Sequence, residues 1–168
     1  MNDVVSIKSP ADIAQSREAG QLAARVLQMI APHVKAGVTT EALDQRCHDY
    51  IVHDLKVIPA NVGYNGFPKT VCISVNHVVC HGIPSADKVL KKGDIVNIDV
   101  AVIKDGWFGD TSRMYFVGEP SPLARRLVNT TYEAMRAGIQ QVRPGATLGD
   151  VGHAIQTVAH RERFSVVR

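Results

Sequence analysis

The fold is decided by residues 96–114, which read VNIDVAVIKDGWFGDTSRM. A segment rich in Val and Ile runs up to the pair Asp105-Gly106, which readily supplies the positive φ angles of a type I′ turn. A second segment of similar length follows this pair. We therefore predict an antiparallel hairpin with Asp105 and Gly106 at its tip.

The register of this hairpin brings two aspartates together. With a two-residue turn, Asp99 faces Ser112 and Ala101 faces Asp110. Because side chains alternate along a strand, Asp99 and Asp110 point to the same face, offset diagonally by one pair step. Two carboxylates about 4 Å apart repel by roughly 4 kcal/mol at an effective dielectric of 20, and a cation between them would turn that repulsion into binding. The pair indicates a metal site; the alternative is that one aspartate is an ordinary turn or edge residue, as Asp105 is.

The composition is that of an ordinary globular domain. The chain has 168 residues, 45% of them hydrophobic and 21% charged, which suits one domain. Its net charge of +3 comes from 19 scattered basic residues against 16 acidic ones, which argues against DNA binding. No basic N-terminal segment precedes an apolar stretch, and no window of about 18 apolar residues exists. We expect a cytoplasmic protein without a membrane partner.

The three cysteines, Cys47, Cys72 and Cys80, are an odd number and show no CxxC spacing. Neither a disulfide framework nor a structural zinc site is indicated. We expect free thiols.

Two helices are predicted before the hairpin. Ser9 and Pro10 have the residue types of an N-cap and a first helical position, and Gly37 is expected to end this helix. Thr39 is expected to cap the second helix. The apolar residues follow helical spacing in both: Ala19, Leu22, Ala23, Val26, Leu27, Ile30 and Val34, then Leu43, Cys47, Tyr50 and Ile51.

A loop and two short strands are predicted between the second helix and the hairpin. The loop covers residues 60–69, and the strands cover residues 71–75 and 78–81. With Asn76-His77 as a two-residue turn, Cys72 would face His81 and both would lie on one side of this smaller hairpin.

Two further helices are predicted after residue 120. Ser121 opens the first, and Thr147 with Asp150 has the spacing of an N-terminal cap for the second. The residues expected to face inward are Ala124, Leu127, Val128, Thr131 and Met135, then Leu148, Val151, Ile155 and Val158.

A short motif recurs between helices. Residues 34–39, VKAGVT, reappear as residues 142–147, VRPGAT, each time after a longer helix and before a shorter one. We therefore predict an internal pseudo-repeat, residues 10–117 and 121–168, within a single portion of a domain covering residues 1–168. The second copy reaches residues 164–168, read as the start of a strand, and is expected to be truncated.

Five motifs in this order resemble the type I methionine aminopeptidases: GYNGFPK at 63–69, VCISVN at 71–76, VCHGIP at 79–84, GDIVNID at 93–99 and GDTS at 109–112. The resemblance extends from Ile7 to Arg168. It implies the pita-bread fold shared with creatinase and aminopeptidase P. That is an α/β (α+β) fold, an antiparallel sheet with helices on its outer face, here with its second half-domain incomplete.

The resemblance also implies a dinuclear metal site, which in the family uses two aspartates, one histidine and two glutamates. Asp99 and Asp110 match the two aspartates. The other three ligands would belong to segments that begin just after Arg168, so we expect the 168-residue chain to be inactive by itself. His153 and His160 do not match the family histidine and are expected to be exposed helix residues.

The substrate side of the site is implied in the same way. His81 matches the histidine that hydrogen-bonds the substrate near the scissile amide, while Tyr64, Phe67 and Cys72 match the pocket for the methionine side chain. Taken alone, His81 has a satisfied core histidine as its less favoured alternative, whereas a loop Tyr64 and Phe67 would more often be ordinary packing residues. Cys72 has no base and orienting partner nearby that would make it a nucleophile.

Two positions depart from the family pattern. Asn61 stands where many relatives have a pocket cysteine, and His77 stands where many have glutamate. These differences put details of the pocket in doubt and leave the reaction class unchanged.

The function implied by the resemblance is removal of the initiator methionine from nascent polypeptides, at the ribosome, with two divalent ions of cobalt, manganese, iron or zinc as cofactors. The alternative from another class is a non-catalytic truncated paralogue or fragment that acts as a binding module or has no function. A metal-free structural domain is disfavoured by the paired aspartates.

Overall fold

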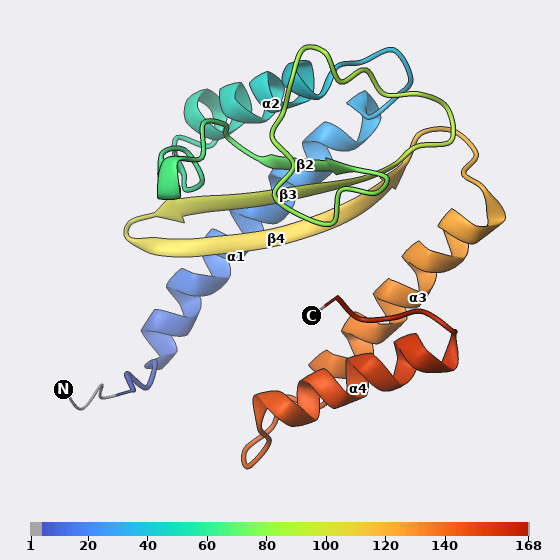
Figure 1. Cartoon of the computed structure of the whole chain (residues 1–168). Helices are drawn as coiled ribbons and strands as arrows, with labels where there is room; N and C mark the ends of the chain where they lie inside the picture. Colours follow the sequence, from blue (N-terminus) through green and yellow to red (C-terminus); the bar gives the residue numbers. More distant parts are fainter. Residues whose placement is uncertain (1–4, 168) are drawn as a thin grey trace. The chain divides into compact units, whose positions relative to one another are not determined.

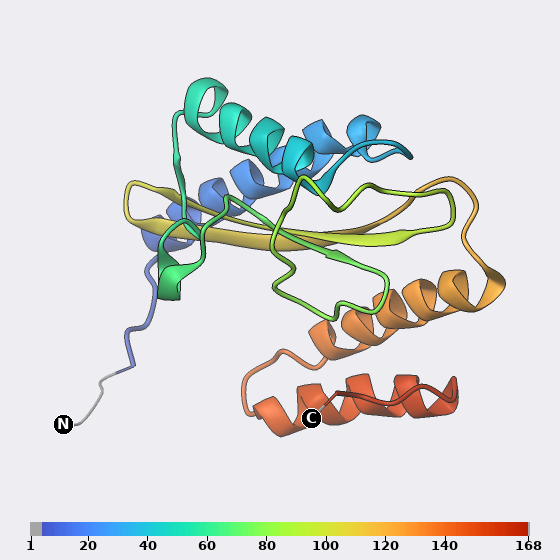
Figure 2. The same cartoon turned by 45° about the horizontal axis from the view of Figure 1, so that its top comes forward.

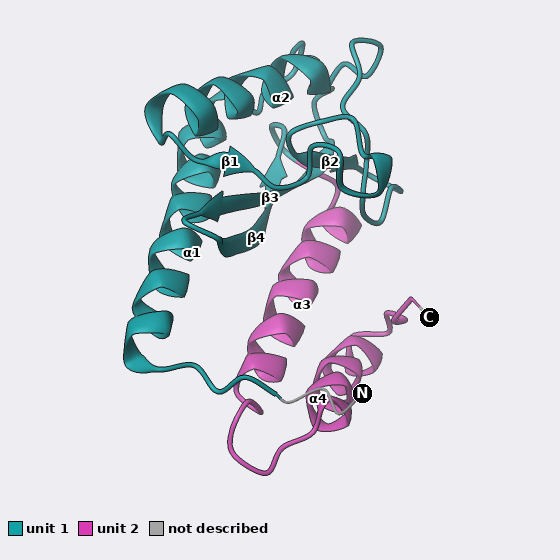
Figure 3. Cartoon of the chain, turned by 90° about the vertical axis from the view of Figure 1, so that its left-hand side faces the viewer, with its two compact units in different colours: residues 1–119 teal, residues 120–168 magenta. Residues whose placement is uncertain are grey.

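The computed structural model describes residues 5–167, and the chain divides into two compact units, residues 1–119 and 120–168 (Figure 3). The first unit contains a sheet and two long helices, and the second contains two helices. In chain order the elements are α1 (Pro10–Ile30), η1 (Ala31–His33), α2 (Thr40–Asp49), η2 (Tyr50–Asp54), β1 (Ile58–Pro59), η3 (Tyr64–Gly66), β2 (Cys72–Val75), β3 (Ile95–Lys104), β4 (Trp107–Phe116), α3 (Pro122–Ile139) and α4 (Leu148–Arg161).

The two helices of the first unit begin where the sequence predicts. Ser9 and Asp12 form a reciprocal capping box at the start of α1, and the Thr39 hydroxyl accepts a hydrogen bond from the Ala42 N–H at the start of α2. The predicted end of α1 at Gly37 is wrong, because the α-helix stops at Ile30 and continues as the single 3₁₀ turn η1. Pro32 lies in that turn, and proline can neither donate an i→i−4 hydrogen bond nor fit against the preceding turn.

The sheet of the first unit is antiparallel, with β3 in its centre (Figure 1). The predicted hairpin is confirmed, since Asp99 pairs with Ser112 and Ala101 with Asp110. Asp105 and Gly106 have φ angles of 50° and 83°, as a type I′ turn requires. The predicted β2 is also present and pairs with β3 on the other side.

α1 and α2 lie on the same side of this sheet (Figure 2). They cover a face made by every second residue of β3, Val96, Ile98, Val100 and Val102, all four of them fully buried. The approach is closest at Gly109 of β4, where a Cβ atom would lie 2.0 Å from the carbonyl oxygen of Ala19 in α1. The opposite face of the sheet therefore carries the side chains that alternate with this apolar row.

The predicted strand at residues 78–81 is wrong. Asn76 lies in the turn that follows β2 and is joined to Ile95 by two hydrogen bonds. The turn is therefore anchored to the start of β3 and does not close a hairpin between β2 and residues 78–81. The chain returns to β2 only at Gly82, whose carbonyl accepts a hydrogen bond from the Ile73 N–H at 2.8 Å. The expected pairing of Cys72 with His81 is therefore wrong too. The two backbones can come this close because Gly82 has no side chain. A Cβ at this position would lie 2.2 Å from the Ile73 carbonyl oxygen.

In the second unit, α3 and α4 pack through small residues. The buried positions of α3 are Thr130, Ala134 and Gly138, spaced four residues apart on one face. A Cβ on Gly138 would lie 2.8 Å from Cγ1 of Ile155 in α4, so the two helices approach closely at this point. α4 begins with a reciprocal capping box between Thr147 and Asp150, as predicted.

The inward face predicted for these helices is partly wrong. Leu127 and Met135 are exposed, Thr131 is exposed beside them, and Leu148 is 90% exposed. The helical spacing was correct. The contact between α3 and α4, however, is made by the smaller neighbouring residues, Thr130, Ala134 and Gly138, which allow the two backbones to come close. Leu127, Thr131 and Met135 instead line an apolar groove of about 410 Å³, together with residues of α4 and the C-terminal segment.

The described part of the C-terminal segment, residues 164–167, is not a strand, although a strand was predicted there. Within residues 5–167, no strand pairs with this segment, and without a partner an extended segment forms no ladder of hydrogen bonds. Arg168 lies outside the described residues. The internal repeat itself stays a prediction.

Across residues 5–167, no helix is long and apolar enough to cross a membrane.

Candidate functional site

The centre of the candidate site is the pair Asp99 and Asp110, on the sheet face opposite α1 and α2. Asp99 alternates with the buried residues of β3, and Asp110 follows Gly109, which faces α1. Burial raises the pKa of Asp99, the negative charge of Asp110 raises it further, and the charge of His81 lowers it. The Asp110 carboxylate is thus close enough to disfavour the charged form of Asp99, as the hairpin register predicted.

Cys72 lies beside this pair, because it is the β2 partner of Asp99. Its side chain is buried, and burial together with the charge of Asp99 raises the pKa of its thiol to about 11. The group is therefore a neutral thiol near pH 7. That it is no nucleophile stays a prediction.

His81 is exposed and has a φ of 56°, in the left-handed region. Its charge acts on the carboxyl of Asp99, so the two groups are close in space although the expected hairpin pairing is absent. The structure thus brings Cys72, His81, Asp99 and Asp110 together.

Tyr64 and Phe67 lie on the loop that leads directly into β2. Tyr64 opens the turn η3 and is 71% exposed, while Phe67 is half-buried. The loop is closed on itself by a hydrogen bond from the Gly63 N–H to the Phe67 carbonyl, and Asn61 donates to the Thr70 carbonyl at 3.3 Å.

Oxygen donors of this kind suit hard or borderline divalent cations. A cation beside Asp99 and Asp110 would relieve the repulsion that raises the pKa of Asp99, so the pair fits a metal as part of a larger ligand set. Within residues 5–167, no three His, Cys, Asp or Glu side chains gather as a metal site. His153 and His160 are exposed on α4, as predicted.

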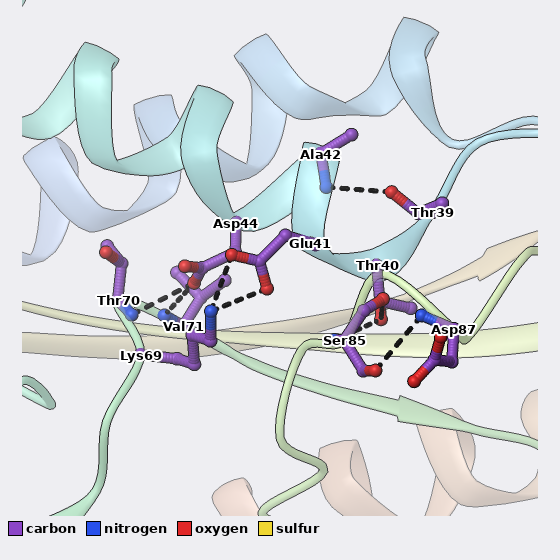
Figure 4. A network of polar contacts seen from close by, with 10 residues as sticks. All are labelled: Thr39, Thr40, Glu41, Ala42, Asp44, Lys69, Thr70, Val71, Ser85 and Asp87. Atoms are coloured by element: carbon purple, nitrogen blue, oxygen red, sulfur yellow. Dashed lines mark hydrogen bonds and ion pairs between the residues drawn. The ribbon is translucent and has the colours of Figure 1, made fainter.

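Asp44 was missed by the sequence analysis. This carboxylate of α2 is only 6% exposed, and its Oδ1 accepts hydrogen bonds from the backbone N–H groups of Thr70 and Val71, each at 2.9 Å (Figure 4). Its spacing from Cys47 and Ile51 puts it on the apolar face of the helix. A charged residue on such a face is the signal that could have revealed it, since buried carboxylates need partners.

Comparisons with known proteins fit this geometry. The family model of metallopeptidase family M24 matches residues 14–168. The chain belongs to this family. The α/β fold with an antiparallel sheet and flanking helices, predicted as pita-bread, is confirmed by the solved M24 structures that it resembles.

Two similar curated proteins are the methionine aminopeptidases of Rickettsia prowazekii, 55% identical over 164 residues, and of Escherichia coli strain K12, 54% identical over 164 residues. Both matches cover 98% of this chain and 62% of the relative, so the chain spans less than two thirds of their length.

Among solved structures, the methionine aminopeptidase of Rickettsia prowazekii matches with a TM-score of 0.95 and 55% identity, covering 98% of this chain and 66% of that one. Prolidase from Pyrococcus furiosus matches with a TM-score of 0.77 at 20% identity, covering 94% of this chain and 44% of that one, which shows the fold alone.

Proposed function

We propose that this chain carries the substrate side and two metal ligands of a methionine aminopeptidase that removes the initiator methionine from nascent polypeptides in the cytoplasm. The observation that carries the proposal is the carboxylate pair Asp99 and Asp110 on one sheet face, within a chain 55% identical to a methionine aminopeptidase. Association with the ribosome is part of the same proposal.

In this proposal each residue has a separate task. Asp99 and Asp110 hold part of a site for two divalent ions, of cobalt, manganese, iron or zinc, which when bound supply Lewis acidity for peptide-bond hydrolysis. His81 donates a hydrogen bond to the substrate beside the scissile amide. Tyr64, Phe67 and the neutral thiol of Cys72 contact the methionine side chain, since aromatic and sulfur surfaces suit a polarisable thioether.

A second candidate is a binding module without catalysis. It is favoured by one observation: among the described residues, no three His, Cys, Asp or Glu side chains are placed so that they could hold a metal ion. One fold often hosts unrelated functions, so the fold does not decide between the aminopeptidase and the binding module.

The deciding experiment measures methionine release from a Met-Ala-Ser peptide with added Mn²⁺, for the 168-residue chain alone and mixed with the C-terminal part of the Rickettsia prowazekii enzyme. We expect release only from the mixture, and none when Asp99→Asn is introduced. Release by neither sample would favour the binding module. Release by the chain alone would show that it recruits its missing ligands in another way.

Calorimetry provides a second measurement on the chain alone. Two carboxylates cannot enclose a cation, so Mn²⁺ should bind weakly, and either Asp99→Asn or Asp110→Asn should abolish this binding. Tight binding that survives both substitutions would place the metal elsewhere.

A further inference from the structure

The first turn of α2 is the meeting point of two loops that carry candidate substrate residues. One is the segment 60–71, with Tyr64 and Phe67, and the other is the segment 81–90, which begins at His81. Both are joined to this turn by hydrogen bonds between residues at least 26 positions apart in the sequence (Figure 4).

The contacts to the second loop come from Thr40. Its hydroxyl accepts a hydrogen bond from the Ser85 N–H at 2.9 Å and donates one to the Ser85 carbonyl at 3.1 Å. The Thr40 N–H also donates to the Lys88 carbonyl at 2.9 Å. Thr40 is 1% exposed, so these bonds are shielded from water.

The contacts to the first loop come from Asp44 and Glu41. Asp44 Oδ1 receives both the Thr70 and the Val71 N–H groups, and Glu41 forms an ion pair with Lys69. Thr70 is held from its other side as well, because its carbonyl accepts the hydrogen bond from Asn61. The residue that follows Val71 is Cys72.

We propose that Asp44 is a positioning residue for the candidate site, because it holds the two residues immediately before β2, Thr70 and Val71, and thereby sets where the Phe67 loop and the Cys72 thiol lie. The proposal rests on the proposed function, which assigns Phe67 and Cys72 to the methionine side chain. A backbone N–H that loses its buried acceptor must find water or remain unpaired. Removal of the Asp44 carboxylate should therefore expose the Thr70 and Val71 backbone to water before the rest of the first unit opens.

The test compares three substitutions by hydrogen exchange and thiol labelling of the full chain. Asp44→Ala removes the acceptor, and we expect the Thr70 and Val71 amides to exchange about tenfold faster or more. Labelling of Cys72 by a thiol reagent, followed for each cysteine by mass spectrometry, should rise by a similar factor. Cys47, fully buried on the same helix, should stay as protected as in the wild type.

The conservative variant separates positioning from a general loss of stability. Asp44→Asn keeps an oxygen where both N–H groups point, so exchange and labelling should stay within about threefold of the wild type. Thr39→Ala is the matched control, because it removes the cap of α2 without touching Thr70. It should destabilise the helix and leave Cys72 protected.

Several results would overturn the proposal. These are unchanged exchange at Thr70 and Val71 in Asp44→Ala, equal acceleration at Cys47 and Cys72, or the same effect from Thr39→Ala. If Asp44→Ala does not fold, Asp44→Glu replaces it, since a longer side chain keeps the charge and displaces the acceptor. None of these measurements uses methionine release, so a failure of the proposed function and a failure of the positioning role are distinguishable.

Discussion

The two units of the chain are built from equally well-capped helices, yet they bury very different side chains. In the first unit, Val26, Ile30, Ile98 and Val100 are all fully buried between helices and sheet. In the second, the buried residues of α3 and α4 are small, and large apolar side chains such as Leu148 remain exposed. Caps and helical periodicity therefore do not by themselves make a core, which requires a broad surface such as the sheet to pack against.

The largest expected effect is in the core of the first unit. Ile98→Ala should lower the free energy of unfolding by about 2–5 kcal/mol, because it removes a fully buried side chain and leaves a cavity. Leu148→Ala, at a residue 90% exposed, should change it by less than about 0.5 kcal/mol. Urea titrations of both variants measure this difference. Equal losses would mean that the second unit has a core of its own around Leu148.

The next effect concerns the contact of α1 with β4. Gly109→Ala should destabilise the first unit by about 1–3 kcal/mol, because the new Cβ would meet the backbone of Ala19, which cannot rotate away. The matched control is Gly20→Ala, which has no atom within 4 Å of the new Cβ and should gain up to about 1 kcal/mol from helix propensity. Thermal unfolding followed by circular dichroism suffices. A tolerated Gly109→Ala would show that α1 can move off the sheet.

A smaller effect is expected at Gly138, the glycine at the close contact between α3 and α4 in the second unit. Gly138→Ala places its Cβ against the side chain of Ile155, which borders the open groove and can turn into it. The clash and the gain in helix propensity should then nearly cancel, leaving a change within about 1 kcal/mol. Gly152→Ala, with open space around its Cβ, is the control and should stabilise. A loss as large as that of Gly109→Ala would show that α3 and α4 pack as rigidly as the first unit.

The smallest expected effect is the pH dependence of Asp44. Burial raises the pKa of this carboxyl more than the two backbone N–H groups and Lys69 lower it, and Glu41 adds to the rise. A raised pKa in the folded state means that protonation stabilises the fold, and that this stability is lost as the pH rises through the folded pKa. Asp44→Asn lacks this titration. Its stability relative to the wild type should increase with rising pH in that window, and a decrease would show that the ionised carboxylate is favoured.

The hairpin of β3 and β4 could be predicted from the sequence because its determinants are local. Asp105 and Gly106 select the turn, and the turn sets which residues face each other. The adjacency of Asp99 and Asp110 followed from that register alone. Their roles as metal ligands, like the substrate roles of His81, Tyr64, Phe67 and Cys72, stay predictions.

The segment after Val75 could not be predicted in the same way, because its path depends on distant partners. Asn76 bonds to Ile95, and Ser85 bonds to Thr40, 45 residues earlier in the chain. Asp44 was overlooked for the same reason, since its two donors lie 26 and 27 residues away. In α3 the periodicity was correct, but periodicity shows which residues share a face and not which face will be covered.

Two glycines described above stand next to candidate functional residues, Gly82 after His81 and Gly109 before Asp110. In both, a Cβ would lie about 2 Å from a neighbouring backbone carbonyl oxygen, so any other residue would force the two backbone segments apart. In an alignment of relatives, each pair would show as two adjacent invariant columns with separate causes. The glycine columns record how closely two pieces of backbone approach, and should persist in relatives whether or not they are catalysts. Under the proposed function, the His81 and Asp110 columns are the ones that would report whether a lineage still selects for catalysis.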